Sequence, residues 1–237
     1  MEINSFDALI MAAFNALARR SWTFDHFVVL ISRSTLLKGG AIVAVYVSLW
    51  FAAAGDQQLR RLRLTAGVVG AFAGLFFVRL LAATLPFRTR PLHAGLEGFV
   101  APYGMETQLQ GWSSFPSDHA TLFLALCVGA MVVPRVGWWC VAYVSVVILT
   151  PRVYLGLHYP TDILGGAVIG VMMALAASHP VVTTRTAWLL TWEKKRPAVF
   201  HPLAFLVLFE MASMFDHVRE IARFAGRVLV EIGRRMG

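Results

Sequence analysis

Residues 64–85, LTAGVVGAFAGLFFVRLLAATL, decide the fold. The stretch has 22 residues, its one charged side chain is that of Arg79, and a proline follows it at position 86. An α-helix rises about 1.5 Å per residue, so a helix of this length crosses the hydrocarbon core of a bilayer, which is about 30 Å thick. The stretch therefore predicts a transmembrane helix that ends at Pro86.

Five further apolar runs lie on either side of it. They cover residues 37–54, 120–133, 136–150, 161–177 and, more weakly, 199–215, and a partly embedded stretch at 24–31 precedes the first. The runs at 120–133 and 136–150 are short for a bilayer, so we expect their helices to continue into the neighbouring polar sequence. The pattern predicts an all-α fold, a polytopic membrane helix bundle of five to six transmembrane helices. Residues 1–237 would form one integral membrane domain, with its motif-bearing core at 64–177.

Composition agrees with a membrane protein. The chain is 58% hydrophobic, has a mean hydropathy of +0.66 and is 14% charged, whereas a soluble domain carries about 25% charged residues. Basic loops at the membrane surface account for the net charge of +8. We expect membrane lipids and no nucleic acid as partners, because a soluble basic face is not evident. Cys127 and Cys140 stand in separate apolar runs, which predicts buried thiols and neither a disulfide nor metal ligands.

The N-terminal segment predicts an amphipathic helix. Its acidic residues come early, and Arg19 and Arg20 follow the apolar part, which is the reverse of a cleavable signal peptide. We therefore expect this helix to lie in the membrane interface.

Basic loops predict the orientation of the bundle. Arginines and lysines gather at 55–63, at Arg135 and at 178–198, and the positive-inside rule puts these connections in the cytoplasm. The connections at 86–119 and 150–160 then face the periplasm or exterior, across the inner (plasma) membrane. His201 and Glu210 fall inside 199–215, so we expect this segment to be peripheral or re-entrant and the basic arm after it to lie on the cytoplasmic side.

Three polar clusters fall in the two outer connections: LPFRTRP at 85–91, FPSDH at 115–119 and PRVYLGLHYPTD at 151–162. In the third, Pro160 suits the first turn of a helix, so His158 lies just before a helix and Asp162 one turn into it. The Asp162 carboxylate can then accept a hydrogen bond from one imidazole nitrogen and leave the other free to attack. Arg152 ends the preceding helix, where its planar guanidinium can bind phosphate oxygens.

Each cluster alone has a plainer interpretation. His158 could be a helix-entry residue, Ser117 or Asp118 an N-cap, and Arg88 and Arg90 anchors at headgroup level. Together, however, the clusters bring several arginines and two histidines beside helix ends on one side of the membrane. That combination predicts an anion site equipped for phosphoryl transfer.

These clusters resemble the type 2 phosphatidic acid phosphatase superfamily. Its pattern is Lys-x6-Arg-Pro, then Pro-Ser-Gly-His, then Ser-Arg-x5-His-x3-Asp. The third motif matches at Arg152, His158 and Asp162, the second at Pro116, Ser117 and His119, and the first at Arg90 and Pro91. The resemblance spans residues 64–177.

The chain departs from this pattern at three positions. Ala83 stands where the first motif has lysine, Asp118 replaces the glycine, and Pro151 replaces the serine. The lysine's role is therefore vacant or passes to Arg79 or Arg88. Arg79 lies about 10 Å inside the helix exit, where a charge must snorkel, pair or line the polar site. We expect the Asp118 side chain to turn away and cap the helix, with its N–H toward phosphate.

The resemblance implies a mechanism without metal or cofactor. The catalytic residues would be His158, His119 and Asp162: His158 attacks phosphorus to give a phosphohistidine, and His119 protonates the leaving oxygen and later helps to activate water. The implied substrate-binding residues are Arg90, Arg152, Ser117, Arg88, Arg79 and Asp118.

The form of the motifs is most similar to the bacitracin-resistance undecaprenyl-diphosphate phosphatases, which implies undecaprenyl diphosphate as the phosphorylated lipid substrate. Phosphatidylglycerophosphate, phosphatidate and lipid A phosphate stay open, as does phosphate transfer to lipid A, because groove shape and loop 92–114 choose the lipid. A protein of another class, which binds or transports a phospholipid without hydrolysis, also stays open. The vacant lysine position favours it, and the two histidines and Asp162 argue against it. The oligomeric state is open.

Overall fold

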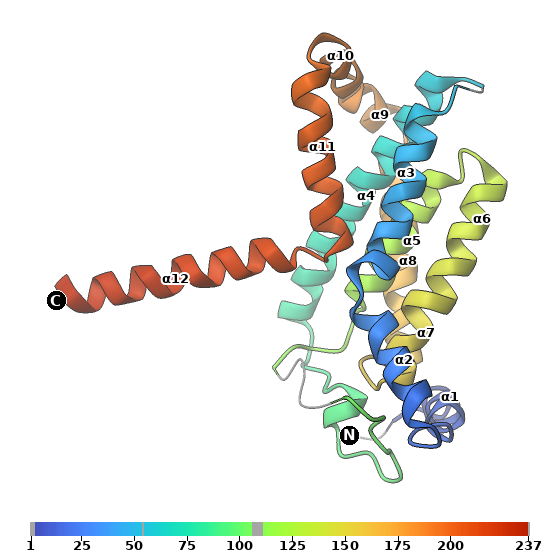
Figure 1. The fold of residues 1–237 in the computed structure, drawn as a ribbon, viewed down its shortest axis with the longest axis vertical. Coiled ribbons are helices and arrows are strands. Elements are labelled where there is room, and N and C mark those ends of the chain that lie inside the picture. The colour runs from blue at the N-terminus through green and yellow to red at the C-terminus, as the bar shows by residue number, and fades with distance from the viewer. Residues whose placement is uncertain (1–2, 54, 106–110, 237) are drawn as a thin grey trace.

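The structure, a computed structural model, describes residues 3–53, 55–105 and 111–236. Every regular element in these ranges is a helix, which confirms the all-α prediction (Figure 1). The bundle is built from α3 (Ala41–Phe51), α4 (Gln57–Thr84), α5 (Asp118–Ala130), α6 (Pro134–Tyr143), α7 (Thr150–Tyr154), α8 (Pro160–Ala177) and α11 (Pro197–Ala212). Around it lie α1 (Ser5–Asn15), α2 (Trp22–Arg33), α9 (Pro180–Thr186), α10 (Trp188–Lys195) and α12 (Asp216–Met236). Three short turns complete the fold: the π-helical η1 (Leu36–Gly40) and η3 (Val144–Leu149) and the 3-10 turn η2 (Pro91–His93).

The chain is a polytopic membrane protein. Within the described ranges, three helices are long and apolar enough to cross a membrane: Gln57–Thr84, Pro134–Tyr154 and Pro160–Ala177. Two bent pairs, Trp22–Arg33 with Leu36–Phe51 and Pro197–Ala212 with Asp216–Arg227, raise this number to five if each pair is one span. The apolar helix α5 is shorter, with 13 residues.

Local sequence sets the helix ends at the polar clusters. The Ser117 hydroxyl caps α5 by accepting a hydrogen bond of 3.4 Å from the Ala120 backbone N–H. α8 begins at Pro160, as its sequence predicts, and the Asp162 carboxylate accepts a 2.8 Å bond from the Tyr159 backbone N–H. Both caps satisfy N–H groups that a helix N-terminus leaves without partners.

Glycines allow α4, α5 and α8 to pack closely. A Cβ added to Gly70 of α4 would lie 2.4 Å from Ala174 Cα of α8, and one added to Gly170 of α8 would lie 2.3 Å from the Thr121 carbonyl oxygen of α5. Small residues at helix contacts let backbones approach in this way inside a membrane. The exit of α4 and the entries of α5 and α8, which carry the polar clusters, are thereby held together.

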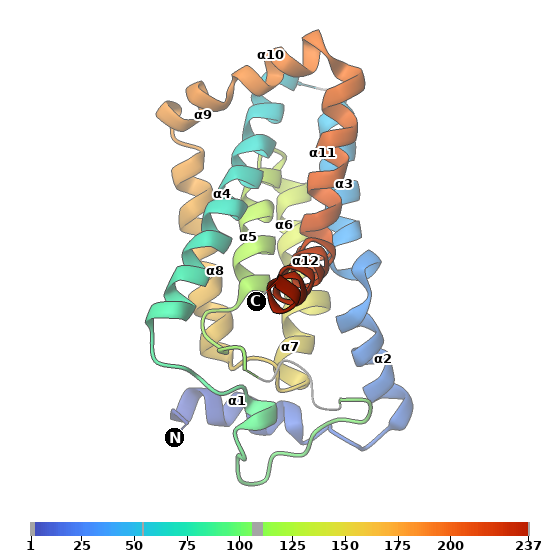
Figure 2. The same cartoon turned by 90° about the vertical axis from the view of Figure 1, so that its left-hand side faces the viewer.

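The bundle has two chemically different ends (Figures 1 and 2). The α3–α4 connection, α9 and α10 lie at one end, which we call the basic end, and the loop after α4 and the entries of α5 and α8 lie at the other, the site end. Helix α1 lies across the site end (Figure 2). One face of α1, with Asp7 and Met11, is buried, whereas Leu9 on another face is 73% exposed.

The C-terminal arm begins at the site end. The 16 residues of α11 rise about 24 Å from the basic end, and α12 then leaves at an angle of 87°. Arg219 of α12 pairs with Asp216 at 2.5 Å, and both residues line a cavity at the site end. Asp216 thus compensates the charge of Arg219, and the cytoplasmic placement of the arm stays a prediction.

Candidate active site

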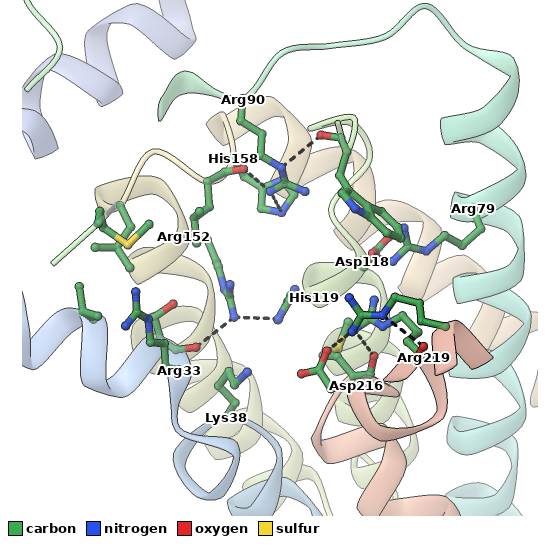
Figure 3. A pocket seen from close by; sticks show the side chains of 18 of the residues that line it. Arg33, Lys38, Arg79, Arg90, Asp118, His119, Arg152, His158, Asp216 and Arg219 are labelled. Atoms are coloured by element: carbon green, nitrogen blue, oxygen red, sulfur yellow. Dashed lines mark hydrogen bonds and ion pairs between the residues drawn. The ribbon is translucent and has the colours of Figure 1, made fainter. Parts of the chain in front are cut away.

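A cavity of about 580 Å³ opens at the site end, between the entry of α5, the end of α7 and η1 (Figure 3). Its basic lining residues are Arg33, Lys38, Arg79, Arg90, Arg152, Arg219 and Arg223, and its described carboxylates are those of Asp118 and Asp216. His119 and His158 also line it. We call this cavity the cation pocket. Its excess of positive charge, held between low-dielectric walls, attracts anions.

A tight turn after α7 fixes His158 next to Arg152. The backbone N–H groups of Leu157 and His158 both donate to the Arg152 carbonyl oxygen, at 2.9 and 3.2 Å. Gly156 permits this turn because it adopts a φ of +67°, which favours glycine. The His158 side chain is consequently buried, with 4% of the residue exposed.

A backbone carbonyl fixes the tautomer of His158. Its Nδ1 lies 2.8 Å from the Ser114 carbonyl oxygen, and since a carbonyl only accepts, Nδ1 carries the proton. Nε2 is therefore unprotonated in the neutral ring, and it lies 3.3 Å from Arg90 Nη1. The nitrogen accepts this hydrogen bond from Arg90, so it can act as a nucleophile once Arg90 turns to another acceptor.

Asp162 lies farther from the His158 ring than the hydrogen bond predicted from the sequence requires. Its Oδ2 is 3.7 Å from His158 Nδ1, too long for a hydrogen bond. The same oxygen accepts a 2.5 Å bond from the Ser114 hydroxyl. Ser114 thus joins the two groups, donating to the carboxylate through its side chain and accepting from the imidazole through its backbone.

The surroundings of His158 favour its neutral form. Burial lowers the pKa of His158 below its usual value of 6.5, and the positive charges of Arg90 and Arg152 lower it further. The Asp162 carboxylate opposes this shift. The ring is therefore neutral and nucleophilic at neutral pH.

Two buried arginines of the predicted site face the pocket beside the histidines (Figure 3). Arg90 donates to the Leu157 carbonyl oxygen at 2.5 Å. Arg152 donates from Nη2 to the Ser32 carbonyl oxygen at 3.2 Å and to His119 Nε2 at 2.7 Å. Its Nε is buried and has no hydrogen-bond partner, so Arg152 retains a donor for an incoming anion.

Arg79 and Asp118 form an ion pair at the rim of the pocket. The Arg79 guanidinium also stacks 4.7 Å from the centre of the Trp112 ring. The prediction that Asp118 caps α5 is therefore wrong: the Ser117 hydroxyl caps the helix, and the Asp118 carboxylate pairs with Arg79. This pairing reduces the cost of a charge within α4, because each group compensates the other.

Arg88 and Ser117 are not among the residues that line the cation pocket. Arg88 lies behind His158, where it donates to Asp162 Oδ1 at 2.5 Å and to Asp7 Oδ2 at 2.8 Å. Asp7 is fully buried and also accepts a 2.9 Å bond from the Thr161 backbone N–H. Helix α1 is thereby joined to the entry of α8. The structure thus brings together His158, His119, Arg90, Arg152, Arg79 and Asp118 at the pocket, and leaves Asp162, Arg88 and Ser117 outside its lining.

Sequence reasoning missed three residues of this region: Ser114, Asp7 and Lys38. Ser114 precedes the FPSDH cluster but acts partly through its backbone, which no side-chain pattern reveals. Asp7 contacts Thr161 across 154 positions, and Lys38 enters the pocket from another helix. Only an acidic residue within an apolar helix and a lysine within an apolar run could have drawn attention to the last two.

The described residues contain no group of three or more His, Cys, Asp or Glu side chains placed to hold a metal ion. Cys127 and Cys140 are both buried and free, as their sequence context predicts.

The membrane bundle and the cation pocket belong to an integral membrane enzyme that hydrolyses lipid phosphates, as the match to a family of such enzymes shows. The chain belongs to the PAP2 superfamily, whose family model matches residues 63–186.

Two relatives are similar to parts of the chain. Undecaprenyl-diphosphatase BcrC of Bacillus subtilis (strain 168) is 27% identical over 164 residues, which cover 69% of this chain and 78% of the relative. The bacitracin transport permease protein BcrC of Bacillus licheniformis is 40% identical over 67 residues, 27% of this chain and 31% of the relative. No solved structure matches the chain.

Proposed function

We propose that the enzyme hydrolyses undecaprenyl diphosphate to undecaprenyl phosphate and inorganic phosphate through a phosphohistidine on His158. The observation that carries this proposal is an unprotonated His158 Nε2 that shares one pocket with Arg90 and Arg152, two arginines without a carboxylate partner among the described residues. The excess of cations suits a diphosphate better than a singly phosphorylated lipid, and the Bacillus subtilis relative carries the name of this activity.

In the first half-reaction, His158 Nε2 attacks the terminal phosphorus, and the bond from that phosphorus to the bridging oxygen breaks. The ring becomes cationic as the N–P bond forms, and the Ser114 carbonyl and Asp162 stabilise its Nδ1–H. Arg90 and Arg152 hold the equatorial oxygens, where electrostatic stabilisation lowers the barrier most. The bridging oxygen leaves with the lipid and takes a proton from the second histidine.

That second histidine, His119, requires Arg152 to exchange partners. In the free site Arg152 donates to His119 Nε2, so this nitrogen is unprotonated. When Arg152 turns to a bound phosphate, His119 Nε2 takes a proton from solvent water and then passes it to the leaving oxygen. In the second half-reaction, water attacks the phosphohistidine, the N–P bond breaks, and His119 takes a proton from that water.

We place the reaction on the periplasmic or outer face of the inner (plasma) membrane. The basic connections lie at the opposite end of the bundle (Figure 1), and basic loops are retained in the cytoplasm. The lipid chain would enter between helices, and residues 1–237 would act as one phosphatase domain.

A substrate panel tests the choice of lipid. The purified full-length enzyme is given undecaprenyl diphosphate, phosphatidylglycerophosphate, phosphatidate and lipid A, with a chelator present, and phosphate release is measured. We expect undecaprenyl diphosphate to be hydrolysed fastest and the chelator to have no effect. If phosphate is released from undecaprenyl diphosphate no faster than from phosphatidate, undecaprenyl diphosphate is not the preferred substrate. Loss of activity with the chelator would contradict the metal-independent mechanism.

Binding or transport without hydrolysis is the competing function, and the alanine at position 83 favours it. The His158→Ala variant separates the two. We expect this variant to retain lipid binding and to lose phosphate release. Unchanged phosphate release would show that His158 is not the nucleophile.

A further inference from the structure

Lys38 enters the cation pocket from the break in the first membrane pass. It belongs to η1, the π-helical turn that begins Leu36–Phe51 directly after the break, where this helix bends by 63° from Trp22–Arg33. Breaks of this kind interrupt the regular hydrogen-bond ladder and are frequent at functional sites. Lys38 is 7% exposed, and in Figure 3 its side chain points toward Arg152 and His119.

A close helix contact holds this break against the pocket. A Cβ added to the neighbouring Gly39 would lie 2.2 Å from Ala212 Cα, at the end of α11. Glycine is therefore required where η1 meets α11, and the preceding residue, Lys38, lines the cavity.

The ammonium group of Lys38, a residue that is buried apart from its access to the cavity, has neither a hydrogen-bond partner nor an ion-pair partner among the described residues. The charges that act on it are those of Arg152 and Arg219, which repel it, and of Asp216, which attracts it. Burial of a charged group is costly unless it is paired. The charge of Lys38 therefore lacks a partner in the protein, and a bound anion would supply one.

We propose that Lys38 binds the lipid-linked phosphate of a diphosphate substrate, so that the pocket contains two phosphate subsites. His158, Arg90 and Arg152 form the first, around the terminal phosphate. Lys38 lies beyond His119 from His158 (Figure 3), so the second subsite is on the side from which the leaving oxygen departs. This inference rests on the proposed function and extends it to the leaving group.

Lys38 does not simply replace the lysine that the first motif lacks. Ala83, at that motif position, lines a smaller cavity of about 250 Å³ on the Arg79 side of His158, which adjoins the cation pocket and shares His158 with it, whereas Lys38 lines the cation pocket and not this smaller cavity. A second cation on the leaving-group side stabilises the charge that collects on the departing phosphate. A lipid monophosphate has no phosphate at that place.

The experiment compares Lys38→Met with wild-type full-length enzyme in detergent, using farnesyl diphosphate and farnesyl phosphate as a matched pair. Lys38→Arg preserves the charge, and Lys194→Met makes the same substitution at an exposed position on α10. For Lys38→Met we expect kcat/KM for the diphosphate to fall about tenfold or more, since a charge-assisted contact is lost. For the monophosphate we expect a change of less than about threefold, and for Lys38→Arg a partial recovery with the diphosphate.

A binding measurement separates this inference from the proposed function. Methylenediphosphonate and inorganic phosphate are measured as competitive inhibitors, and Lys38→Met should weaken only the diphosphonate. An equal fall for both farnesyl substrates, no change for either, or wild-type enzyme that binds the diphosphonate no better than phosphate would each overturn the second subsite. If diphosphonate binding depends on Lys38 but undecaprenyl diphosphate is a poor substrate, the proposed function fails and the second subsite stands.

Discussion

The two sides of the His158 ring lie in opposite electrostatic environments. Behind Nδ1, the side chains of Asp7, Arg88, Ser114 and Asp162 form a closed set, which we call the rear network. Arg88 bonds to Asp7 at 2.8 Å and to Asp162 at 2.5 Å, and Ser114 bonds to Asp162 at 2.5 Å. Every charged group in this network has a partner.

The cation pocket in front of Nε2 is different. Arg90, Arg152 and Lys38 have no carboxylate within ion-pair distance in the described parts of the chain, and Arg152 Nε has no hydrogen-bond partner. A satisfied network holds a ring in place, whereas an unsatisfied one is completed by a ligand. The contrast supports the proposal that the rear network positions His158 and that the pocket binds the anion.

Removal of a pocket cation should have the largest effect. Arg152→Met removes the donors to the equatorial oxygens, and we expect kcat/KM to fall by about 10³-fold. Arg152→Lys keeps the charge but loses the planar fork, so it should recover activity only in part. The control is Arg185→Met, an exposed position on α9 at the basic end. If kcat/KM of Arg152→Met falls less than about fivefold, the cation pocket does not bind the anion in the way that its contrast with the rear network suggests.

Within the rear network, Asp162→Asn should have a smaller effect, about 10²-fold in kcat. In a triad whose carboxylate alone fixes the imidazole tautomer, the same change costs about 10⁴-fold. Here the Ser114 carbonyl keeps the proton on His158 Nδ1, so the ring retains its tautomer without the carboxylate. Steady-state kinetics with a folded variant measure this, and a 10⁴-fold loss would show that the carbonyl does not fix the ring.

The pH profile tests the environment of Nε2 directly. The lowered pKa of His158 keeps the ring neutral at pH values above that pKa, and protonation below it removes the nucleophile. kcat/KM should therefore be retained as the pH falls to 6.5 and should decline at lower pH, by about tenfold per pH unit. An acidic limb with a midpoint above 6.5 contradicts the burial of a neutral imidazole.

The outermost member of the rear network should affect activity least. Asp7→Asn weakens the contacts to Arg88 and Thr161, and we expect kcat to fall only about threefold while the protein loses roughly 1–3 kcal/mol of stability. Thermal unfolding and kinetics are measured on the same preparation, with Glu97→Gln in the loop at the site end as the control. A large loss of kcat without a loss of stability would place Asp7 in the chemistry itself.

Sequence predicts the fold and much of the pocket for definite reasons. Hydrophobic runs of membrane length specify the helices, and Pro160 fixes the start of α8 with His158 before it. The rear network is harder to predict because it depends on a backbone carbonyl and on Asp7 from a distant helix. Arg88 and Arg90 are two residues apart, yet Arg88 bonds to Asp162 and Asp7 whereas Arg90 bonds to the Leu157 carbonyl, a difference that the sequence spacing does not reveal. Lys38 is equally hard to predict, because the direction of its side chain depends on a break in the helix.

Trapping of the phosphoenzyme tests the central claim most directly. Undecaprenyl diphosphate labelled in its terminal phosphate is mixed with the His119→Ala variant, which should form the intermediate and hydrolyse it slowly, and the protein is then quenched and digested. We predict an acid-labile, alkali-stable label on the peptide that contains His158, and none in a His119→Ala, His158→Ala double variant. A label on another residue, or hydrolysis that persists in His158→Ala alone, would contradict the account.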